Sequence, residues 1–390
     1  MIACKLAYRN LVGAGVRTWL TVFVLSLSYV LIIWHQGLLR GWDRMARRDM
    51  IDWEIGGGIY WHARYDPYDA FTIPESHGRL SPILESEVAN GTAVPVLISQ
   101  GTLYPEGRMQ NVLLKGIPPH QAVLQIPSAS LNPAGDAIPV LLGRRMAERS
   151  RLRVGDAVTL RWRDRHGTFD AAEAAVVGVF KTNVPSVDAG QLWIPLARLQ
   201  TMLAMPHEAT LVVLAKGAKA VDSGPDWTFK DHAFLLADIQ RIIQTKSVGG
   251  SVLYIIMMFL AMLAIFDTQV FSVFRRQREI GTHMALGMTR GQVIRLFTVE
   301  GAMHGILAGI LAAVYGIPLL GMLAAKGWKL PPSTEGYGLV MAERIFPMYG
   351  LGLILGTVIL ILLATTVVSC LPARRISKMK PTDALRGRIQ

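Results

Sequence analysis

A run of apolar residues near the middle of the chain limits its possible folds more than any other feature. Residues 251–274 carry one formal charge, Asp267, and a helix of this length can cross the roughly 30 Å hydrocarbon core of a bilayer. Three further runs are similarly long and apolar: residues 18–39, 296–325 and 349–372. Hydrophobic residues make up 51% of the chain and charged residues 17%, a composition too apolar for an ordinary soluble protein. We therefore predict an α-helical membrane protein with four transmembrane helices.

The segment between the first two predicted spans, residues 40–246, has a different texture. Short β-like runs alternate with helical pieces and with Gly, Pro, Asn and Asp turns. The predicted strands are residues 92–98, 112–114, 157–162, 174–180 and 210–214, and the predicted helices are residues 81–88, 144–150, 196–203 and 234–245. We expect a large α+β extracytoplasmic (periplasmic) domain here, with residues 138–196 as a candidate second lobe. Its fold must depend on its own core, because the two cysteines, Cys4 and Cys370, lie outside it.

Basic residues cluster in three places that are expected to face the cytoplasm. The loop at residues 275–295 contains five arginines and one acid, residues 1–17 predict a basic amphipathic helix on the membrane surface, and residues 373–390 form a basic tail. Both termini are then cytoplasmic in a multi-pass inner-membrane protein, and residues 326–345 form an outer loop. The net charge of +12 is explained by topology and by contact with anionic membrane lipids, not by nucleic acid.

The first span is expected to be a retained anchor. Its apolar core is longer than that of a signal peptide, and no small-residue cleavage site follows it. Four arginines after the span, Arg40, Arg44, Arg47 and Arg48, favour the opposite orientation. We give them less weight because long domains translocate largely regardless of charge.

A short helix is predicted inside the loop at residues 275–295. Residues 276–286 lack proline and place Ile280 and Met284 four apart, so an apolar stripe lies between arginines. Gly287 suits the left-handed conformation that ends such a helix. The positive-inside rule explains the arginines alone, but it does not explain the spacing of the glycines.

The next spanning helix has a start signal of its own. Thr289 and Gln292 form a Thr-x-x-Gln capping box ahead of an apolar run. The loop therefore predicts a short helix across the membrane surface, separated by a cap from the third span.

These motifs resemble those of a known family. Arg278-Glu279-Ile280-Gly281, followed by Ala285-Leu286-Gly287 and Thr289-Arg290, resembles the coupling-helix motif of the FtsX/MacB-type ABC transporter permeases, which include LolC/LolE-like lipoprotein-releasing subunits. The resemblance implies the MacB-like, type VII ABC transporter fold. It also implies a set of residues that contact an ATPase: Arg276, Arg278, Glu279, Ile280, Gly281, Met284, Ala285, Leu286, Gly287 and Thr289.

The chain lacks the P-loop pattern G-x-x-x-x-G-K-[S/T], so it is not expected to be an enzyme, and no cofactor, metal site or catalytic residue is expected in it. The resemblance implies two copies of a separate cytoplasmic ABC ATPase that bind ATP and Mg, and a second permease, identical or related. ATP-driven closure of the ATPases would move the coupling helix. Residues 18–39 and 251–274 would carry this motion to the outer domain, a mechanism called mechanotransmission.

A lipoprotein or another amphiphile is the favoured cargo, extracted from the inner membrane and passed to a periplasmic chaperone or adaptor. Withdrawing acyl chains from a bilayer costs about 0.8 kcal/mol per CH₂, so the step needs a shielded route and an energy source. Two alternatives remain: a MacB-like tripartite efflux permease for peptides or drugs, and an FtsX-like signalling subunit that activates a cell-wall hydrolase without transport.

Three polar residues fall inside the predicted spans. Glu300 and His304 lie four apart on one helix face, which is consistent with a metal or proton site. We favour a simpler role, a polar pair that bonds to a neighbouring helix. Asp267 is either neutral or paired with a residue of another helix.

Glycines in the third span predict close packing of helices. Gly301, Gly305 and Gly309 follow one another at four-residue spacing, which lets another helix approach closely. A bend is expected further along, near Pro318.

Overall fold

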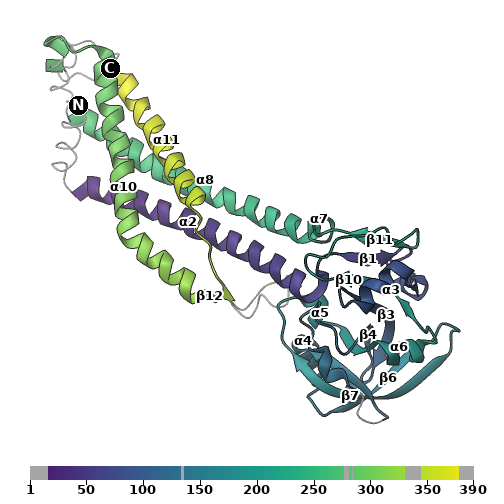
Figure 1. Ribbon diagram of the computed structural model, residues 1–390. Coiled ribbons are helices and arrows are strands. Elements are labelled where there is room, and N and C mark those ends of the chain that lie inside the picture. Colours follow the sequence, from purple (N-terminus) through teal and green to yellow (C-terminus); the bar gives the residue numbers. More distant parts are fainter. Residues whose placement is uncertain (1–15, 133–135, 276–280, 283, 330–343, 377–390) are drawn as a thin grey trace. The chain divides into compact units, whose positions relative to one another are not determined.

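The computed structural model describes residues 16–132, 136–275, 281–282, 284–329 and 344–376 (Figure 1). The chain forms two compact units. Among the described residues, the helical unit contains residues 16–42, 243–329 and 344–376, and the α+β unit contains residues 43–242. The division falls within two long helices, so both helices contribute residues to each unit.

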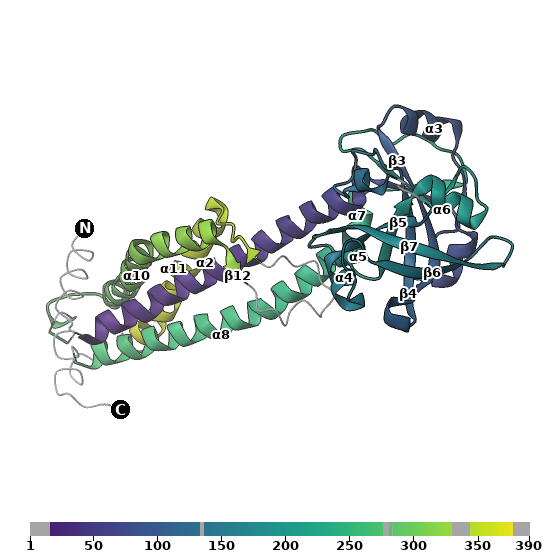
Figure 2. The same ribbon diagram turned by 90° about the horizontal axis from the view of Figure 1, so that it is seen from below.

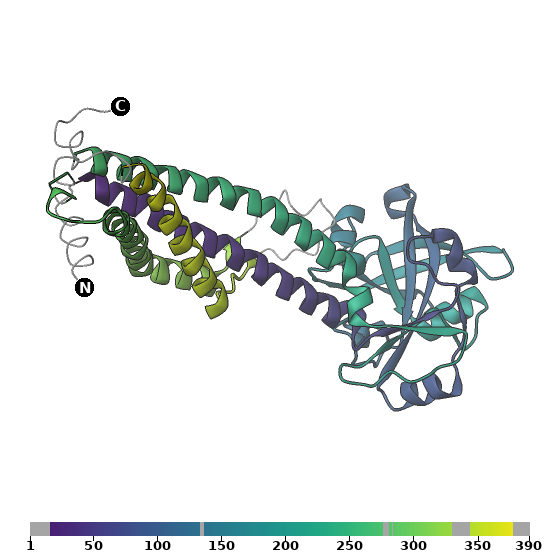
Figure 3. The same cartoon turned by 90° about the horizontal axis from the view of Figure 1, so that it is seen from above.

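Four helices are long and apolar enough to cross a membrane, which confirms the predicted number. They are α2 (Val16–Met50), α8 (Ala237–Arg275), α10 (Arg290–Lys326) and α11 (Leu351–Ile376). Within the helical unit, α10 lies beside α11 (Figures 1 and 3), and α2 runs alongside α8 (Figure 2). Thr21 Oγ1 on α2 is 2.9 Å from Thr268 Oγ1 on α8. Buried apolar side chains of all four helices form the core of this unit.

Two of these helices differ from the predicted spans. α2 runs to Met50 instead of ending at Leu39, and its last turns are stabilised by an Arg47–Asp43 pair of 2.9 Å. Most of the helix predicted at residues 234–245 and the span predicted at residues 251–274 belong to one helix, α8, which is continuous from Ala237 to Arg275. Gly250 interrupts the apolar pattern without ending the helix, and a Cβ there would lie 2.6 Å from the His35 ring of α2. The glycine therefore permits close packing.

α10 begins where the Thr289–Gln292 capping box predicts, ahead of the predicted span of residues 296–325, and it ends at Lys326. It starts at Arg290, so residues 290–295 belong to the helix and not to the preceding loop, and it runs without interruption through Pro318. Short strands β12 (Trp328–Lys329) and β13 (Arg344–Ile345) pair antiparallel at the two ends of the outer loop. The remainder of that loop, residues 1–15 and residues 377–390 lie outside the described residues.

The α+β unit contains a nine-stranded sheet in the order β11-β1-β10-β3-β4-β8-β5-β7-β6. Its strands are β1 (Ile59–His62), β3 (Ala93–Leu103), β4 (Gln110–Ile117), β5 (Ile138–Gly143), β6 (Ala157–Arg163), β7 (Phe169–Phe180), β8 (Gln191–Pro195), β10 (Leu211–Leu214) and β11 (Trp227–Lys230). A second sheet pairs β2 (Gly78–Arg79) with β9 (Glu208–Ala209).

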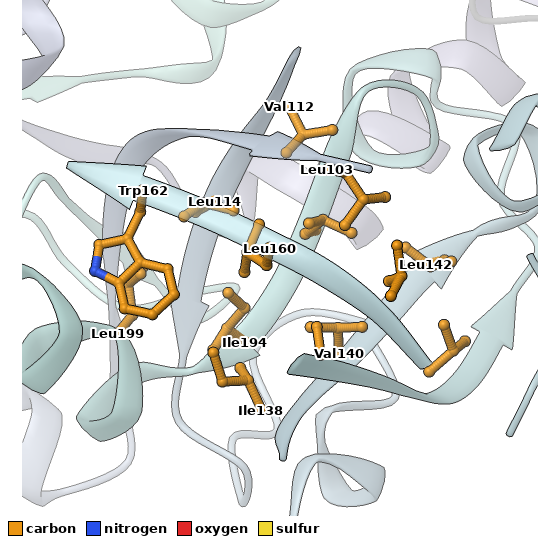
Figure 4. Packing of buried hydrophobic residues seen from close by; sticks show 14 of the residues in the cluster. Leu103, Val112, Leu114, Ile138, Val140, Leu142, Leu160, Trp162, Ile194 and Leu199 are labelled. Carbon is orange, nitrogen blue, oxygen red and sulfur yellow. The ribbon is translucent and has the colours of Figure 1, made fainter. Parts of the chain in front are cut away.

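Six of the nine strands close into a ring. β6 pairs with β7 and also with β3, where Gly101–Leu103 lie opposite residues 160–162. Alternate residues of β6, namely Val158, Leu160 and Trp162, are buried while their neighbours are exposed. Figure 4 shows Leu114, Leu160 and Ile194, from three different strands, among the side chains that fill the interior. This apolar core replaces the disulfides that the unit lacks.

Helical segments connect the strands and cover the sheet. The α-helices are α3 (Pro82–Ala89), α4 (Arg144–Ser150), α5 (Pro185–Asp188), α6 (Leu196–Leu203) and α7 (His232–Leu235). The 3₁₀ helices are η2 (Ala70–Glu75), η3 (Pro105–Gly107) and η4 (Ser128–Leu131), and η1 (Ile51–Ile55) is a π-helical turn that follows α2 directly.

The local predictions for this unit are confirmed. All five predicted strands and the helices at residues 81–88, 144–150 and 196–203 are present. Residues 138–196 supply four strands of the closed ring, and β3 and β4 supply the other two. The ring therefore requires residues outside the candidate lobe, and a separate lobe boundary stays a prediction.

Candidate functional site

The loop between α8 and α10 carries all of the residues predicted to contact an ATPase. Residues 281–282 and 284–285 are helical, and the Leu286 amide donates to the Thr282 carbonyl at 3.0 Å. Gly281 is buried, Ala285 is exposed, and Leu286 is 80% exposed. Four members of the predicted set, Arg276, Arg278, Glu279 and Ile280, lie outside the described residues.

The two end signals of this loop are confirmed. Gly287 has φ +99°, a conformation that favours glycine, and its amide donates to the Met284 carbonyl at 3.1 Å. Thr289 accepts from the Gln292 amide at 3.3 Å, and the Gln292 side chain accepts from the Thr289 amide at 2.8 Å. The reciprocal pair fixes where α10 begins.

The loop is seated on the ends of two helices. Buried Val293 and Phe297 of α10 and Ala373 of α11 form a small apolar cluster. Met284 and Met288 of the loop pack against this cluster, so a force on the loop acts on both α10 and α11. No local pattern pointed to Ala373, because only the tertiary structure brings the end of α11 to the loop.

The polar residues of the spanning helices lie in different surroundings. Glu300 and His304 are buried, and His304 Nδ1 is 2.9 Å from the Glu300 carbonyl oxygen, so the contact is to backbone. His304 Nε2 has no hydrogen-bond partner among the residues that the structure describes. Asp267 is exposed on α8 and interacts with other groups. In the part of the chain that the structure describes, no three His, Cys, Asp or Glu residues are grouped as metal ligands.

The spaced glycines of α10 face α11 at two positions. A Cβ on Gly301 would lie 1.8 Å from Ser369 Oγ, and one on Gly305 would lie 2.8 Å from Thr365 Oγ1. A Cβ on Gly309 would have more space, because its nearest neighbour, the Tyr29 ring of α2, would lie 3.9 Å away. The closest approach of α10 and α11 is therefore at Gly301.

We expect Gly301→Ala to destabilise the helical unit by about 1–3 kcal/mol. The added methyl group would also lie 2.2 Å from Ser369 Cβ, which cannot rotate away, so the helices must separate. Thermal unfolding in detergent measures the effect. The matched control is Gly321→Ala on the same helix, where a Cβ has no neighbour within 4 Å. Equal melting temperatures for the two variants would contradict the proposed close contact.

Three acids at the end of α2 and in η1 bind different parts of the α+β unit. We call Asp49, Asp52 and Glu54 the anchor acids. Asp49 Oδ2 accepts from Asn183 Nδ2, between β7 and α5, at 2.9 Å. No local pattern indicated these contacts, because the partners lie far away along the chain.

Asp52 is the most strongly held anchor acid. It is buried and forms an ion pair with Lys216, just after β10. Gln125 Nε2 donates to its carboxylate at 3.3 Å, and Arg48 Nε is 3.6 Å from it. The Asp52 carbonyl also accepts from the Gln125 amide at 2.9 Å. Helix α2 therefore ends in a polar cluster attached to several loops of the sheet.

Glu54 contacts a buried cation inside the unit. Its carboxylate accepts from Ser186 Oγ of α5 and lies 3.9 Å from Lys115 Nζ on β4. Lys115 Nζ is also 5.2 Å from the centre of the Trp193 ring. Burial lowers the pKa of Lys115, and the nearby Glu54 carboxylate offsets part of that effect.

The lowered pKa of Lys115 gives stability a specific pH dependence. The unfolded chain binds a proton that the folded state disfavours, so the free energy of unfolding rises with pH from the lowered pKa up to the ordinary value near 10.5. We expect Lys115→Met to abolish this rise and to leave stability at neutral pH unchanged or higher by up to about 2 kcal/mol. Urea unfolding measured at a series of pH values tests this prediction, because it gives the free energy of unfolding at each pH. Lys219→Met, at an exposed lysine, should retain the wild-type profile.

Four helices able to span a membrane, with a large α+β unit after the first, define this chain as a multi-pass membrane protein. A family match narrows the class of membrane protein. Residues 251–381 match the FtsX-like permease C-terminal family. The chain therefore carries an FtsX-like permease domain, and the resemblance to FtsX/MacB-type permeases is confirmed.

Similar proteins extend the match beyond this domain. The lipoprotein-releasing system transmembrane protein LolC of Neisseria meningitidis is 25% identical over 330 residues, covering 75% of this chain and 77% of LolC. The macrolide export ATP-binding/permease protein MacB of Chromobacterium violaceum is 23% identical over 212 residues, covering 50% of this chain and 30% of MacB. The solved periplasmic region of MacB from Actinobacillus actinomycetemcomitans aligns at 13% identity with a TM-score of 0.31, covering 48% of this chain and 94% of that one.

Proposed function

We propose that this protein is the permease subunit of an ABC transporter and that a separate ATPase drives it through the loop between α8 and α10. The observation that carries the proposal is the seating of this loop on the ends of α10 and α11, with Leu286 left exposed. An exposed leucine beside a glycine-terminated helix provides an apolar contact for a partner protein. ATP and Mg belong to that partner.

The anchor acids support a mechanical route to the outer unit. The end of α2 is attached to the sheet through Asp49, Asp52 and Glu54, so a displacement of this helix reorients the loops that hold them. α8 leads into the same unit after α7. We infer that motion of the coupling loop reaches the α+β unit through these two helices, and that a second permease, identical or related, completes the transporter.

The cargo that we propose is a lipoprotein or another lipidated amphiphile extracted from the inner membrane. The match with LolC, which covers three quarters of this chain, supports this cargo. Export of peptides or drugs, as proposed for a MacB-like permease, and activation of a cell-wall hydrolase, as proposed for an FtsX-like subunit, predict different outer partners. Affinity capture with the full chain distinguishes them, because the partner is a lipoprotein chaperone, an efflux adaptor or a hydrolase.

Topology gives a direct test of the proposal. In a variant without Cys4 and Cys370, a cysteine at Leu286 should react with a membrane-impermeant maleimide only from the cytoplasmic side. A cysteine at Tyr68, which is 81% exposed in the α+β unit, should react only from the outside. Labelling of Leu286→Cys from the outside would exclude ATPase coupling through this loop.

A further inference from the structure

A groove lies on the α+β unit beside β1 and β11. Its volume is about 400 Å³, within the range of about 300–1,000 Å³ that is usual for small-molecule sites. Aromatic and basic side chains line much of it: Trp61, Arg64, Tyr65, Tyr68, Lys230 and Phe234. Neither the anchor acids nor the loop between α8 and α10 contributes to it, so the proposed coupling leaves this groove without a role.

Three rings form one apolar wall of the groove. Trp61 of β1 is in contact with Tyr65 and with Phe234 of α7, both in edge-on geometry, with ring centres 5.4 and 5.7 Å apart. Phe234 is 53% exposed. Such rings present large, rigid apolar surfaces at little cost in conformational entropy. They can hold an alkyl chain or a ring.

Lys230 places a cation beside two of these rings. Lys230 Nζ lies 5.6 Å from the centre of the Trp61 ring and 4.7 Å from that of Phe234. Among the residues that the structure describes, no carboxylate lies within ion-pair distance of Lys230. Ring faces attract a cation but carry no net charge, so the ammonium group remains available to an anion.

The lining residues of the groove carry a small positive surplus, because Arg64 and Lys230 are basic and one lining residue is acidic. Arg64 is 3.5 Å from Glu75, and both side chains are mostly exposed, so this ion pair is weak. Asp66 is the acid in the lining, and its carboxylate accepts from the Tyr68 amide at 2.9 Å. Burial lowers the pKa of His62, so His62 adds no charge at neutral pH. The groove thus combines apolar walls with positive charge.

We propose that this groove binds an amphiphilic anion, an alkyl or aromatic group that carries a phosphate or carboxylate. The anionic group lies at Lys230 Nζ, and the apolar part lies against Trp61, Tyr65 and Phe234. An apolar ligand alone would leave the ammonium without a counter-charge, and an inorganic anion would leave the rings in water. A lipidated cargo or a membrane lipid carries both an apolar chain and an anionic group. The role of the groove in transport therefore rests on the proposed function.

Calorimetric titration of the full chain in nanodiscs with octyl phosphate tests the proposal, with protein-free nanodiscs as the blank. Octyl phosphate should bind more tightly than octanol or inorganic phosphate. Lys230→Met and Trp61→Ala should each weaken its binding by about tenfold. Lys219→Met removes an exposed lysine outside the groove and should leave the affinity unchanged. Melting temperatures verify that each variant is folded.

A second ligand distinguishes a lipid or lipidated ligand from a small free amphiphile, since both combine an apolar group with an anion. Binding of lysophosphatidylglycerol as well as octyl phosphate supports a lipid or lipidated ligand, whereas binding of octyl phosphate alone supports a small free amphiphile. Equal affinities for octanol and octyl phosphate, or unchanged affinity in both groove variants, would overturn the proposal. Co-purification of the ATPase, measured on the same preparations, reports on the proposed function separately, because the groove variants should retain it.

Discussion

Gly287→Val is expected to abolish co-purification of the chain with its ATPase while insertion into the membrane is unchanged. Gly287 has φ +99°, which a β-branched side chain cannot adopt without strain of about 1–3 kcal/mol. The strained turn moves Leu286 and breaks the contact between the Gly287 amide and the Met284 carbonyl. Because the partner must recognise one fixed arrangement of the loop, a small local rearrangement should cost most of the affinity.

The matched control for this experiment is Gly291→Val. Gly291 lies in the first turn of α10, where a Cβ meets nothing within 4 Å and φ is not positive. This variant adds the same side chain four residues away without backbone strain, so it should still co-purify with the ATPase. Bulky residues at Gly281, which is buried, should act like Gly287→Val. Wild-type co-purification of Gly287→Val would contradict the assignment of this loop as the coupling site.

Asp52→Ala is expected to uncouple ATP hydrolysis from work in the outer unit. Removing the carboxylate breaks the Lys216 pair and the Gln125 hydrogen bond. Lys216 is half exposed, so water can solvate the released ammonium. The free energy of unfolding should therefore fall by about 2 kcal/mol, which is less than the loss expected when a fully buried ion pair is broken. A coupling free energy is typically about 1–3 kcal/mol, so cargo release per ATP should fall by about tenfold.

The measurement is ATP-dependent release of a lipoprotein from proteoliposomes, with the ATPase rate recorded in the same samples. Asp43→Ala is the control, because Asp43 lies on α2, just before η1, and its more exposed carboxylate forms a pair with Arg47 worth at most about 1 kcal/mol. It should release cargo normally. If the Asp52→Ala variant released as much lipoprotein per ATP hydrolysed as the wild type, the anchor acids would not transmit the motion.

Much of the local structure could be predicted because it depends on short-range patterns. The apolar runs that gave the four spans, the alternation along β6 and the Thr289–Gln292 cap each involve residues within one element. The same reasoning failed where a distant contact decided the outcome. The sequence pattern predicts a helix at residues 234–245 and a separate span at residues 251–274, whereas α8 is continuous across Gly250, which packs against His35 of α2.

The functional residues also divide into those that local patterns could predict and those that depend on distant contacts. The loop around Leu286 and Gly287 could be located from spacing and cap signals, although Arg278, Glu279 and Ile280 lie outside the described residues and their role stays a prediction. The anchor acids and the groove could not be located. Asp52 meets Lys216, and Trp61 meets Lys230, only because strands β1, β10 and β11 are neighbours in the sheet.

The sequence by itself determined how many times the chain can cross a membrane, where its helices are capped and which segments are strands. These properties arise from the hydrophobicity and backbone preferences of neighbouring residues. Only the tertiary structure decided that six strands close into a ring, that α2 ends among loops of the sheet and that Lys230 lies beside aromatic rings. Pairings between distant segments depend on the packing of the whole core, and no local pattern encodes them.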